Sequence, residues 1–176
     1  MDYCTKPISR SKLRMIAGFI RKLFKSKNKY FFDVVKVFEL LPHYFDNVFT
    51  EIVSDDDQEL NGVPAATILL ENRRYCIKVK ESVYEKAYFE KNGGYRMHIM
   101  HEISHYLLFM LGYTPQFDRV YKNKELKSYE SVEWQAKALA GEILIPYENT
   151  IDMSTMSIMR KCKVSREAAL NRKKIG

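Results

Sequence analysis

The sequence His-Glu-Ile-Ser-His at residues 101–105, inside the apolar run Tyr95–Leu111, constrains the fold of this chain more than any other feature. An apolar run of this length predicts a buried α-helix. Residues four apart lie on the same face of a helix, so His101 and His105 should point the same way and could bind one ion. Glu102 should lie about 100° around the helix, beside that ion. This spacing is typical of zinc hydrolases, whose carboxylate takes a proton from water at the metal.

The same motif is compatible with a structural role, in which both histidines would hydrogen-bond backbone carbonyls inside a buried helix. The surrounding residues favour the metal site, because they supply an apolar surface while the histidine stripe stays narrow. These apolar residues are Ile99, Ile103, Tyr106, Leu107, Met110 and Leu111. Gly112 then ends the helix as a C-cap. We therefore interpret His101 and His105 as candidate metal ligands and Glu102 as the candidate general base.

A catalytic zinc ion needs a third protein ligand, and the segment from Glu133 to Pro146 offers a candidate. Read as a helix, it places Glu133 at the head of a face that continues with Ala136, Ala140, Gly141 and Leu144. Small residues let two helices pack closely, so this carboxylate could reach a metal on the neighbouring helix. Glu130, one turn earlier, is a rival ligand or a partner of a ligating histidine. Glu142, about half a circle from Glu133, should face elsewhere.

Together the two motifs resemble those of the ImmA/IrrE family of zinc metallopeptidases. The resemblance covers about residues 75–176 and includes Arg96, which matches an Arg often found five positions before the first motif, and the segment 163–169. It implies a zincin-like fold in which His101, His105 and Glu133 hold Zn²⁺ and Glu102 is catalytic. The departures from the family pattern fall outside the ligand positions; they are Ser104, Lys137 and Leu139.

Three strand-like segments precede the predicted metal helix. Residues 47–53 alternate in polarity, and residues 65–71 and 75–80 predict a hairpin around Asn72 and Arg73. We therefore expect an α+β fold, mainly helical, with a small three-stranded antiparallel sheet packed on the HExxH helix. The resemblance implies that an edge of this sheet lies along the cleft and pairs with an extended substrate.

Helices are also predicted towards both ends of a single domain covering residues 1–176. A basic amphipathic helix is expected at about residues 9–26, and a second helix is expected to end before Pro42. A small helical extension at about residues 147–176 has a spacing similar to a helix-turn-helix, although a buttress for the metal domain is the favoured interpretation. A capping box is predicted at residues 82–85, followed by a glycine pair that could act as a hinge.

The charge of the chain is unevenly distributed. Residues 1–30 contain nine Lys or Arg and one Asp, and residues 156–176 contain seven Lys or Arg and one Glu, although the net charge is only +7. Basic ends could attract nucleic acid, but solvated helix faces are the favoured interpretation. Three widely spaced cysteines fit a reducing compartment, and no apolar run reaches membrane-spanning length. We expect a cytoplasmic protein without a membrane partner.

Peptide hydrolysis also needs a donor to the oxyanion of the tetrahedral intermediate. The sequence offers several candidates without choosing among them: Tyr113, Tyr121, Tyr129, Tyr147 and His98. We expect a zinc-dependent endopeptidase, and the resemblance implies that its substrate is an Xre-type helix-turn-helix repressor, cleaved to relieve repression in a mobile element or stress response. The alternative is a non-catalytic DNA- or protein-binding regulator, or a toxin-antitoxin component, that retains the zinc fold.

Overall fold

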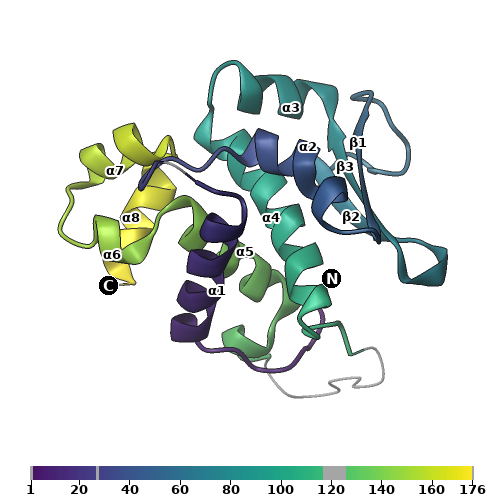
Figure 1. The fold of residues 1–176 in the computed structure, drawn as a ribbon, viewed down its shortest axis with the longest axis horizontal. Coiled ribbons are helices and arrows are strands. Elements are labelled where there is room, and N and C mark those ends of the chain that lie inside the picture. The colour runs from purple at the N-terminus through teal and green to yellow at the C-terminus, as the bar shows by residue number, and fades with distance from the viewer. Residues whose placement is uncertain (1, 27, 117–125, 176) are drawn as a thin grey trace.

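The structure, a computed structural model, describes residues 2–26, 28–116 and 126–175, and consists of a small sheet at one end of a larger group of helices (Figure 1). The helices are α1 (Arg10–Leu23), α2 (Val34–Tyr44), α3 (Glu81–Tyr88), α4 (Gly93–Met110), α5 (Val132–Leu144), α6 (Tyr147–Thr150), α7 (Thr155–Cys162) and α8 (Arg166–Lys174), with 3-10 turns η1 (Glu71–Arg73) and η2 (Ser128–Glu130). The strands are β1 (Val48–Val53), β2 (Ala65–Leu69) and β3 (Tyr75–Lys80). The predicted α+β, mainly helical fold is confirmed.

The three-stranded sheet has the order β1-β3-β2 and is mixed. β2 and β3 form the predicted antiparallel hairpin, with Thr67 opposite Ile77. β1 pairs with β3 in parallel, with Thr50 opposite the same Ile77, so the prediction of a fully antiparallel sheet was wrong. The reason lies in burial, because Cys76, Ile77 and Val79 make β3 the most buried strand. At the centre of the sheet, both edges of β3 pair with a neighbouring strand.

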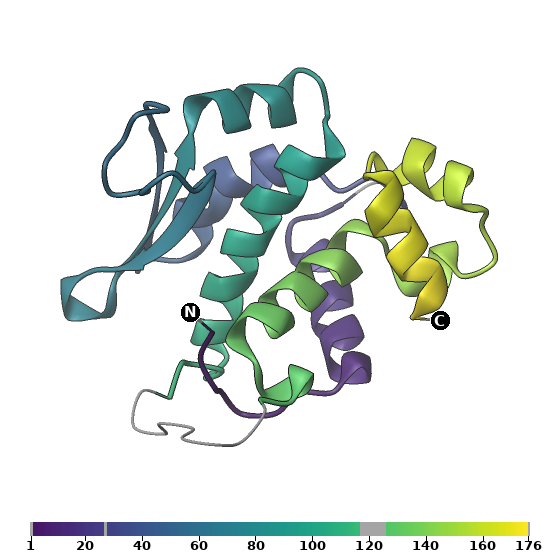
Figure 2. The same ribbon diagram turned by 180° about the vertical axis from the view of Figure 1, so that it is seen from behind.

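The helix that carries the HExxH motif, α4, lies between the sheet and α5 (Figure 2). Asn92 caps it by accepting a hydrogen bond from the Gly94 amide, and Gly112 follows its end with a φ of +83°. The glycine pair is not a hinge outside the helix, because Gly93 and Gly94 form its first turn. A Cβ on Gly93 would lie 2.5 Å from the backbone nitrogen of Ser165, so this glycine permits close contact with the α7–α8 turn.

Arg96 fixes the same end of α4 to the helices at the C-terminal end of the chain. Arg96 is 1% exposed, and its guanidinium donates hydrogen bonds to the backbone oxygens of Cys162, Lys163 and Phe32. Burial lowers the pKa of Arg96 to about 10. The Arg that the family resemblance pointed out therefore caps the C-terminal end of α7 and holds α4 in place.

Several predicted boundaries shift by a few residues. The basic helix predicted at 9–26 is α1. Its N-cap is Ser9, whose side chain accepts a hydrogen bond from the Lys12 amide. α2 continues through Pro42 to Tyr44, because a proline in the last turn removes a single helical hydrogen bond. The capping box at 82–85 was wrong: α3 begins at Glu81 without a side-chain cap.

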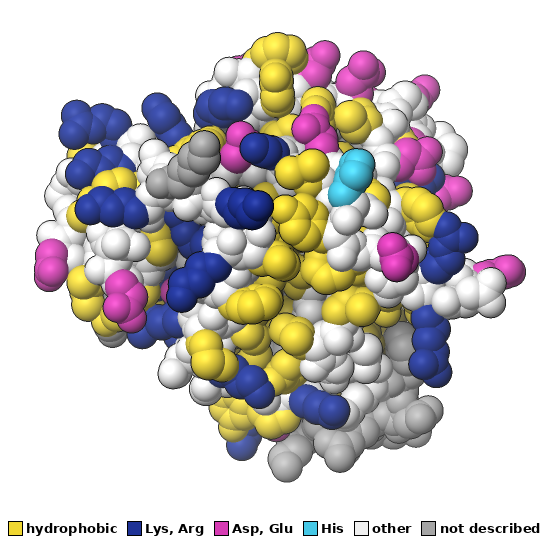
Figure 3. Space-filling model, in the orientation of Figure 1, with side chains coloured by type: hydrophobic (Ala, Val, Ile, Leu, Met, Phe, Trp, Pro, Cys, Tyr) yellow, Lys and Arg dark blue, Asp and Glu magenta, His cyan; other side chains and the backbone are white. Residues whose placement is uncertain are grey.

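α7 and α8 form the predicted pair of helices in the C-terminal extension, separated by Lys163 in a left-handed conformation. Arg172 of α8 is buried against α5, where it bonds Glu142, so at least one basic residue of this extension is committed to the interior. Other Lys and Arg side chains gather on the face of the molecule over α7 and α8, while acidic side chains are more frequent near the sheet (Figure 3). Within the described ranges, no helix is long and apolar enough to cross a membrane.

Candidate metal centre

The imidazoles of His101 and His105 meet on one face of α4, as the four-residue spacing predicts. Their Nε2 atoms are 3.0 Å apart. The Glu133 carboxylate reaches them from α5, with Oε2 lying 3.2 Å from Nε2 of His101 and Oε1 lying 3.4 Å from Nε2 of His105. Three potential ligands from two helices therefore converge on one point.

The distances among the donor atoms of these three side chains match those that a tetrahedral metal ion requires. Zinc bonds imidazole nitrogen and carboxylate oxygen at about 2.0–2.2 Å, so two ligands of a tetrahedral site lie about 3.3 Å apart. The distances of 3.0, 3.2 and 3.4 Å between the three side chains bracket that value. Two imidazoles and one carboxylate also match the composition of catalytic zinc sites, which keep a fourth position open. The residues therefore fit the ion.

Glu102 lies next to these three side chains, in a drier environment than Glu133. One of its oxygens is 4.0 Å from Nε2 of His101, and its side chain is 14% exposed. One carboxylate oxygen of Glu102 and one ring nitrogen each of His101 and His105 lie within 4.8 Å of one another, so this carboxylate is close to the proposed ion as well. Burial raises the pKa of Glu102, against the opposing effect of the nearby histidines. A carboxylate whose pKa is raised is a stronger base, which suits proton transfer from water.

Two contacts set the position of these side chains. The hydroxyl of Thr67, on β2, donates a hydrogen bond of 2.9 Å to the backbone oxygen of Glu102 and so ties the sheet edge to the motif. On the other side, α4 and α5 pack closely through fully buried Ala136 and Ala140. Gly141 does not share this contact, because it lines a separate groove beside α8.

Glu133 differs from Glu102 in exposure and in pKa. Its side chain is 54% exposed, whereas the two imidazoles that it contacts are largely shielded. Hydrogen bonding to His101 and His105 holds the pKa of Glu133 well below its usual range. The carboxylate therefore stays ionised, as metal binding requires.

The other candidate ligands and oxyanion donors lie in different parts of the structure. Glu142 faces away from the histidines, as expected, and is buried. The 3-10 turn containing Glu130 directs its backbone oxygen to the Thr5 amide, and the imidazole contacts come from Glu133 instead. Among the proposed oxyanion donors, His98 lines the cleft at the metal site, whereas Tyr147 and Tyr129 line other grooves and Tyr113 is buried. Tyr121 lies outside the described residues.

A cleft of about 560 Å³ opens over the histidines. Its floor is α4, and one wall is the β2 edge and the preceding segment, including Val63 and Leu69, which are 45% and 61% exposed. Tyr75 and Phe109 add an aromatic surface, with ring centroids 5.9 Å apart. The opposite wall includes Tyr3, which no local sequence signal could have placed there, because only backbone pairing brings it close.

One comparison with known proteins found a family match for the part of the chain that contains this site. A sequence model of a peptidase family, described as the IrrE N-terminal-like domain, matches residues 71–174. The matched range contains β3, the motif helix α4 and the helix α5 that carries Glu133. No curated protein and no solved structure matches the chain.

Proposed function

The chain belongs to the peptidase family of the IrrE N-terminal-like domain, and on that premise we propose that it is a zinc-dependent endopeptidase. In this proposal His101, His105 and Glu133 hold the ion, and Glu102 is the general base. The observation that supports it most directly is the convergence of the Glu133 carboxylate on two imidazoles, at 3.2 and 3.4 Å. A structural role for the histidines would not need a half-exposed carboxylate from another helix.

Each residue would have a distinct part in peptide hydrolysis. Zn²⁺, when bound, would lower the pKa of a water molecule and polarise the peptide carbonyl. Glu102 accepts a proton from the attacking water and passes it to the leaving amine nitrogen. Of the candidate donors in the described part of the chain, His98 lines the same cleft and could donate a hydrogen bond to the oxyanion.

The substrate would bind as an extended segment. β2 has β3 on one side in the described sheet, and its other edge borders the cleft. A peptide can add to such an edge through backbone hydrogen bonds while exposed apolar side chains, such as Leu69, contact its side chains. This favours a flexible, partly apolar segment of a protein.

We propose an Xre-type helix-turn-helix repressor as that protein, cleaved in a mobile element or stress response. This choice follows the family resemblance. A cytoplasmic location is part of the same proposal, since the repressor acts there and the three cysteines are buried thiols, as suits a reducing compartment.

The test uses purified protein loaded with one equivalent of zinc and the repressor encoded next to its gene. We expect cleavage at one site, detected by mass spectrometry of the fragments. Glu102→Gln should keep the zinc but reduce the cleavage rate by about 10²–10⁴-fold, because the general base is lost.

A matched control is Glu130→Gln, which changes a glutamate outside the site. This variant should cleave the repressor at the wild-type rate. Equal cleavage by wild type and Glu102→Gln would exclude the proposed mechanism. An intact repressor that is nevertheless bound equally by both proteins would instead indicate the non-catalytic regulator.

A further inference from the structure

The first residues of the chain lie against the amino end of α5, next to the metal site (Figure 2). The Thr5 amide donates to the backbone oxygen of Glu130, and the Val132 amide donates to that of Tyr3, at 2.8 and 3.0 Å. Cys4 and Ser131 form an antiparallel β-bridge between these bonds. A short two-stranded contact thus joins residues 2–5 to the turn that begins α5.

Asp2 completes this contact with its side chain. Its Oδ1 accepts a hydrogen bond from the backbone amide of Glu133, at 3.2 Å, and its Oδ2 accepts one from the Ser131 hydroxyl, at 2.5 Å. The Ser131 oxygen in turn accepts from the Trp134 amide, at 2.8 Å. Asp2 therefore bonds directly to the residue whose carboxylate contacts both histidines.

Without residues 2 and 3, the Val132 and Glu133 amides at the start of α5 would lose their acceptors. The first amides of a helix have no acceptor inside it, and helix ends fray when those amides are left to water. In α5 the amides of Val132, Glu133 and Trp134 bond to Tyr3, Asp2 and Ser131, respectively. Two of the three acceptors come from the N-terminal segment. A negative charge at this end also favours the helix dipole.

The position of Glu133 makes this arrangement matter for metal binding. Glu133 is the second residue of α5, and its side chain is 54% exposed, so packing alone does not fix it. Fraying of the first turn would move its carboxylate relative to imidazoles that are fixed on another helix. A metal site tolerates little such movement, because its bond lengths are fixed within about 0.2 Å.

We infer that Asp2 is a positioning residue of the metal centre, which holds the backbone of Glu133 so that its carboxylate meets His101 and His105. The inference rests on the proposed zinc site. The contacts of Asp2 with this site are hydrogen bonds from the Glu133 amide and the Ser131 hydroxyl, so the inferred role acts through the backbone of α5. Residues 2–5 lie outside the range matched by the family model, so this support is added by the N-terminal part of the chain.

The experiment measures zinc affinity of the full-length protein by competition with a chromogenic chelator. Partners that orient metal ligands typically contribute about 10–100-fold in affinity. We expect Asp2→Ala to weaken zinc binding by about 10-fold or more, and Asp2→Asn, whose amide oxygen can still accept from Glu133, to recover most of it. Amide hydrogen exchange at Glu133 in the zinc-free protein should be faster in Asp2→Ala than in Asp2→Asn.

Ser154→Ala is the matched control, because it removes the N-cap of α7, which accepts from the Ser157 amide far from the histidines along the chain. It should lower thermal stability without changing zinc affinity. If Asp2→Ala and Ser154→Ala behave alike, the role of Asp2 is only structural and the inference is wrong. If wild type binds no zinc, the proposed function fails first; if zinc binds but no repressor is cleaved, the affinity comparison still decides the role of Asp2.

Discussion

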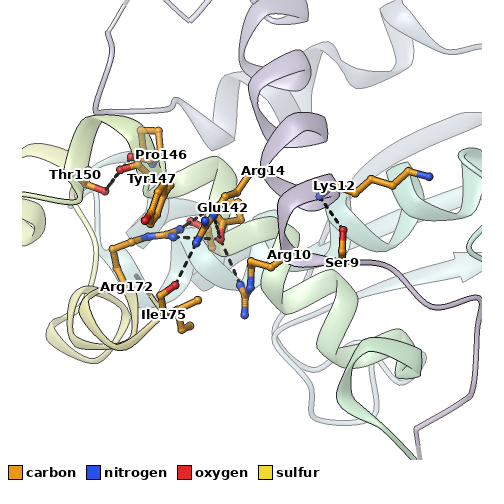
Figure 4. A network of polar contacts seen from close by, with 11 residues as sticks. Ser9, Arg10, Lys12, Arg14, Glu142, Pro146, Tyr147, Thr150, Arg172 and Ile175 are labelled. Carbon is orange, nitrogen blue, oxygen red and sulfur yellow. Dashed lines mark hydrogen bonds and ion pairs between the residues drawn. The ribbon is translucent and has the colours of Figure 1, made fainter.

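Two glutamates at opposite ends of α5 meet very different surroundings. Glu133, in the first turn, is half-exposed and contacts two imidazoles. Glu142, near the last turn, has a side chain that is 1% exposed and is surrounded by arginines (Figure 4). The two glutamates of this helix therefore occupy different environments. Glu133 lies at the open cleft, and Glu142 is buried inside the protein.

The Glu142 carboxylate is surrounded by arginines, which are permanent cations. Arg172 of α8 binds both of its oxygens, at 3.1 and 2.9 Å, and Arg10 and Arg14 of α1 approach Oε1 at 3.5 and 3.6 Å. Arg14 also stacks on Tyr147, with its guanidinium carbon 3.5 Å from the ring centroid. The carboxylate thus joins α1, α5 and α8, and its charge is neutralised by the protein.

Glu133 lacks such a permanent cation among its described contacts, since its partners His101 and His105 are residues that must be neutral to ligate a metal. The contacts of a carboxylate therefore distinguish a structural ion pair from a candidate metal ligand. A carboxylate saturated by guanidinium groups stabilises the fold, whereas one that faces imidazoles at an open cleft can complete its charge balance with a metal ion.

Glu142→Gln should have the largest effect on stability. Removing one partner of a buried ion pair typically costs about 3–5 kcal/mol, because the opposite charges stay buried without compensation. We expect a loss of that size in the free energy of unfolding, measured by urea denaturation of the zinc-free protein. The folded fraction should bind zinc with wild-type affinity. A loss below about 1 kcal/mol would show that the arginines are solvated and that the two ends of α5 differ less than proposed.

Glu133→Gln should have the reverse profile. Since partners of metal ligands contribute about 10–100-fold in affinity, loss of a ligand should weaken zinc binding by at least about 100-fold. The free energy of unfolding without zinc should change by less than about 1 kcal/mol, as is usual for exposed ion pairs. Chelator competition and urea denaturation measure the two quantities. Wild-type zinc affinity in this variant, with a loss in Glu130→Gln instead, would move the third ligand to Glu130.

The sequence predicts the parts of this contrast that depend on helical spacing. The four-residue interval between His101 and His105, and the half circle between Glu133 and Glu142, follow from α-helix geometry. What it could not predict depends on contacts between distant segments. The insertion of β3 between the other strands and the approach of Asp2 to Glu133 arise from long-range pairing, for which the local sequence carries no periodic signal.

The smallest effect tests whether the two ends of α5 act independently. Gly141 lies next to Glu142, and a Cβ added there would meet nothing within 4 Å. Gly141→Ala should therefore raise the free energy of unfolding by about 0.5–1 kcal/mol, because alanine favours the helix and restricts the unfolded chain. Zinc affinity should not change, since the first turn is held by its own hydrogen bonds. Gly93→Ala is the matched contrast, as its Cβ would lie 2.5 Å from the Ser165 nitrogen, and it should destabilise the protein. A tighter zinc site in Gly141→Ala would mean that the stiffness of the whole helix, and not only the contacts of its first turn, positions Glu133.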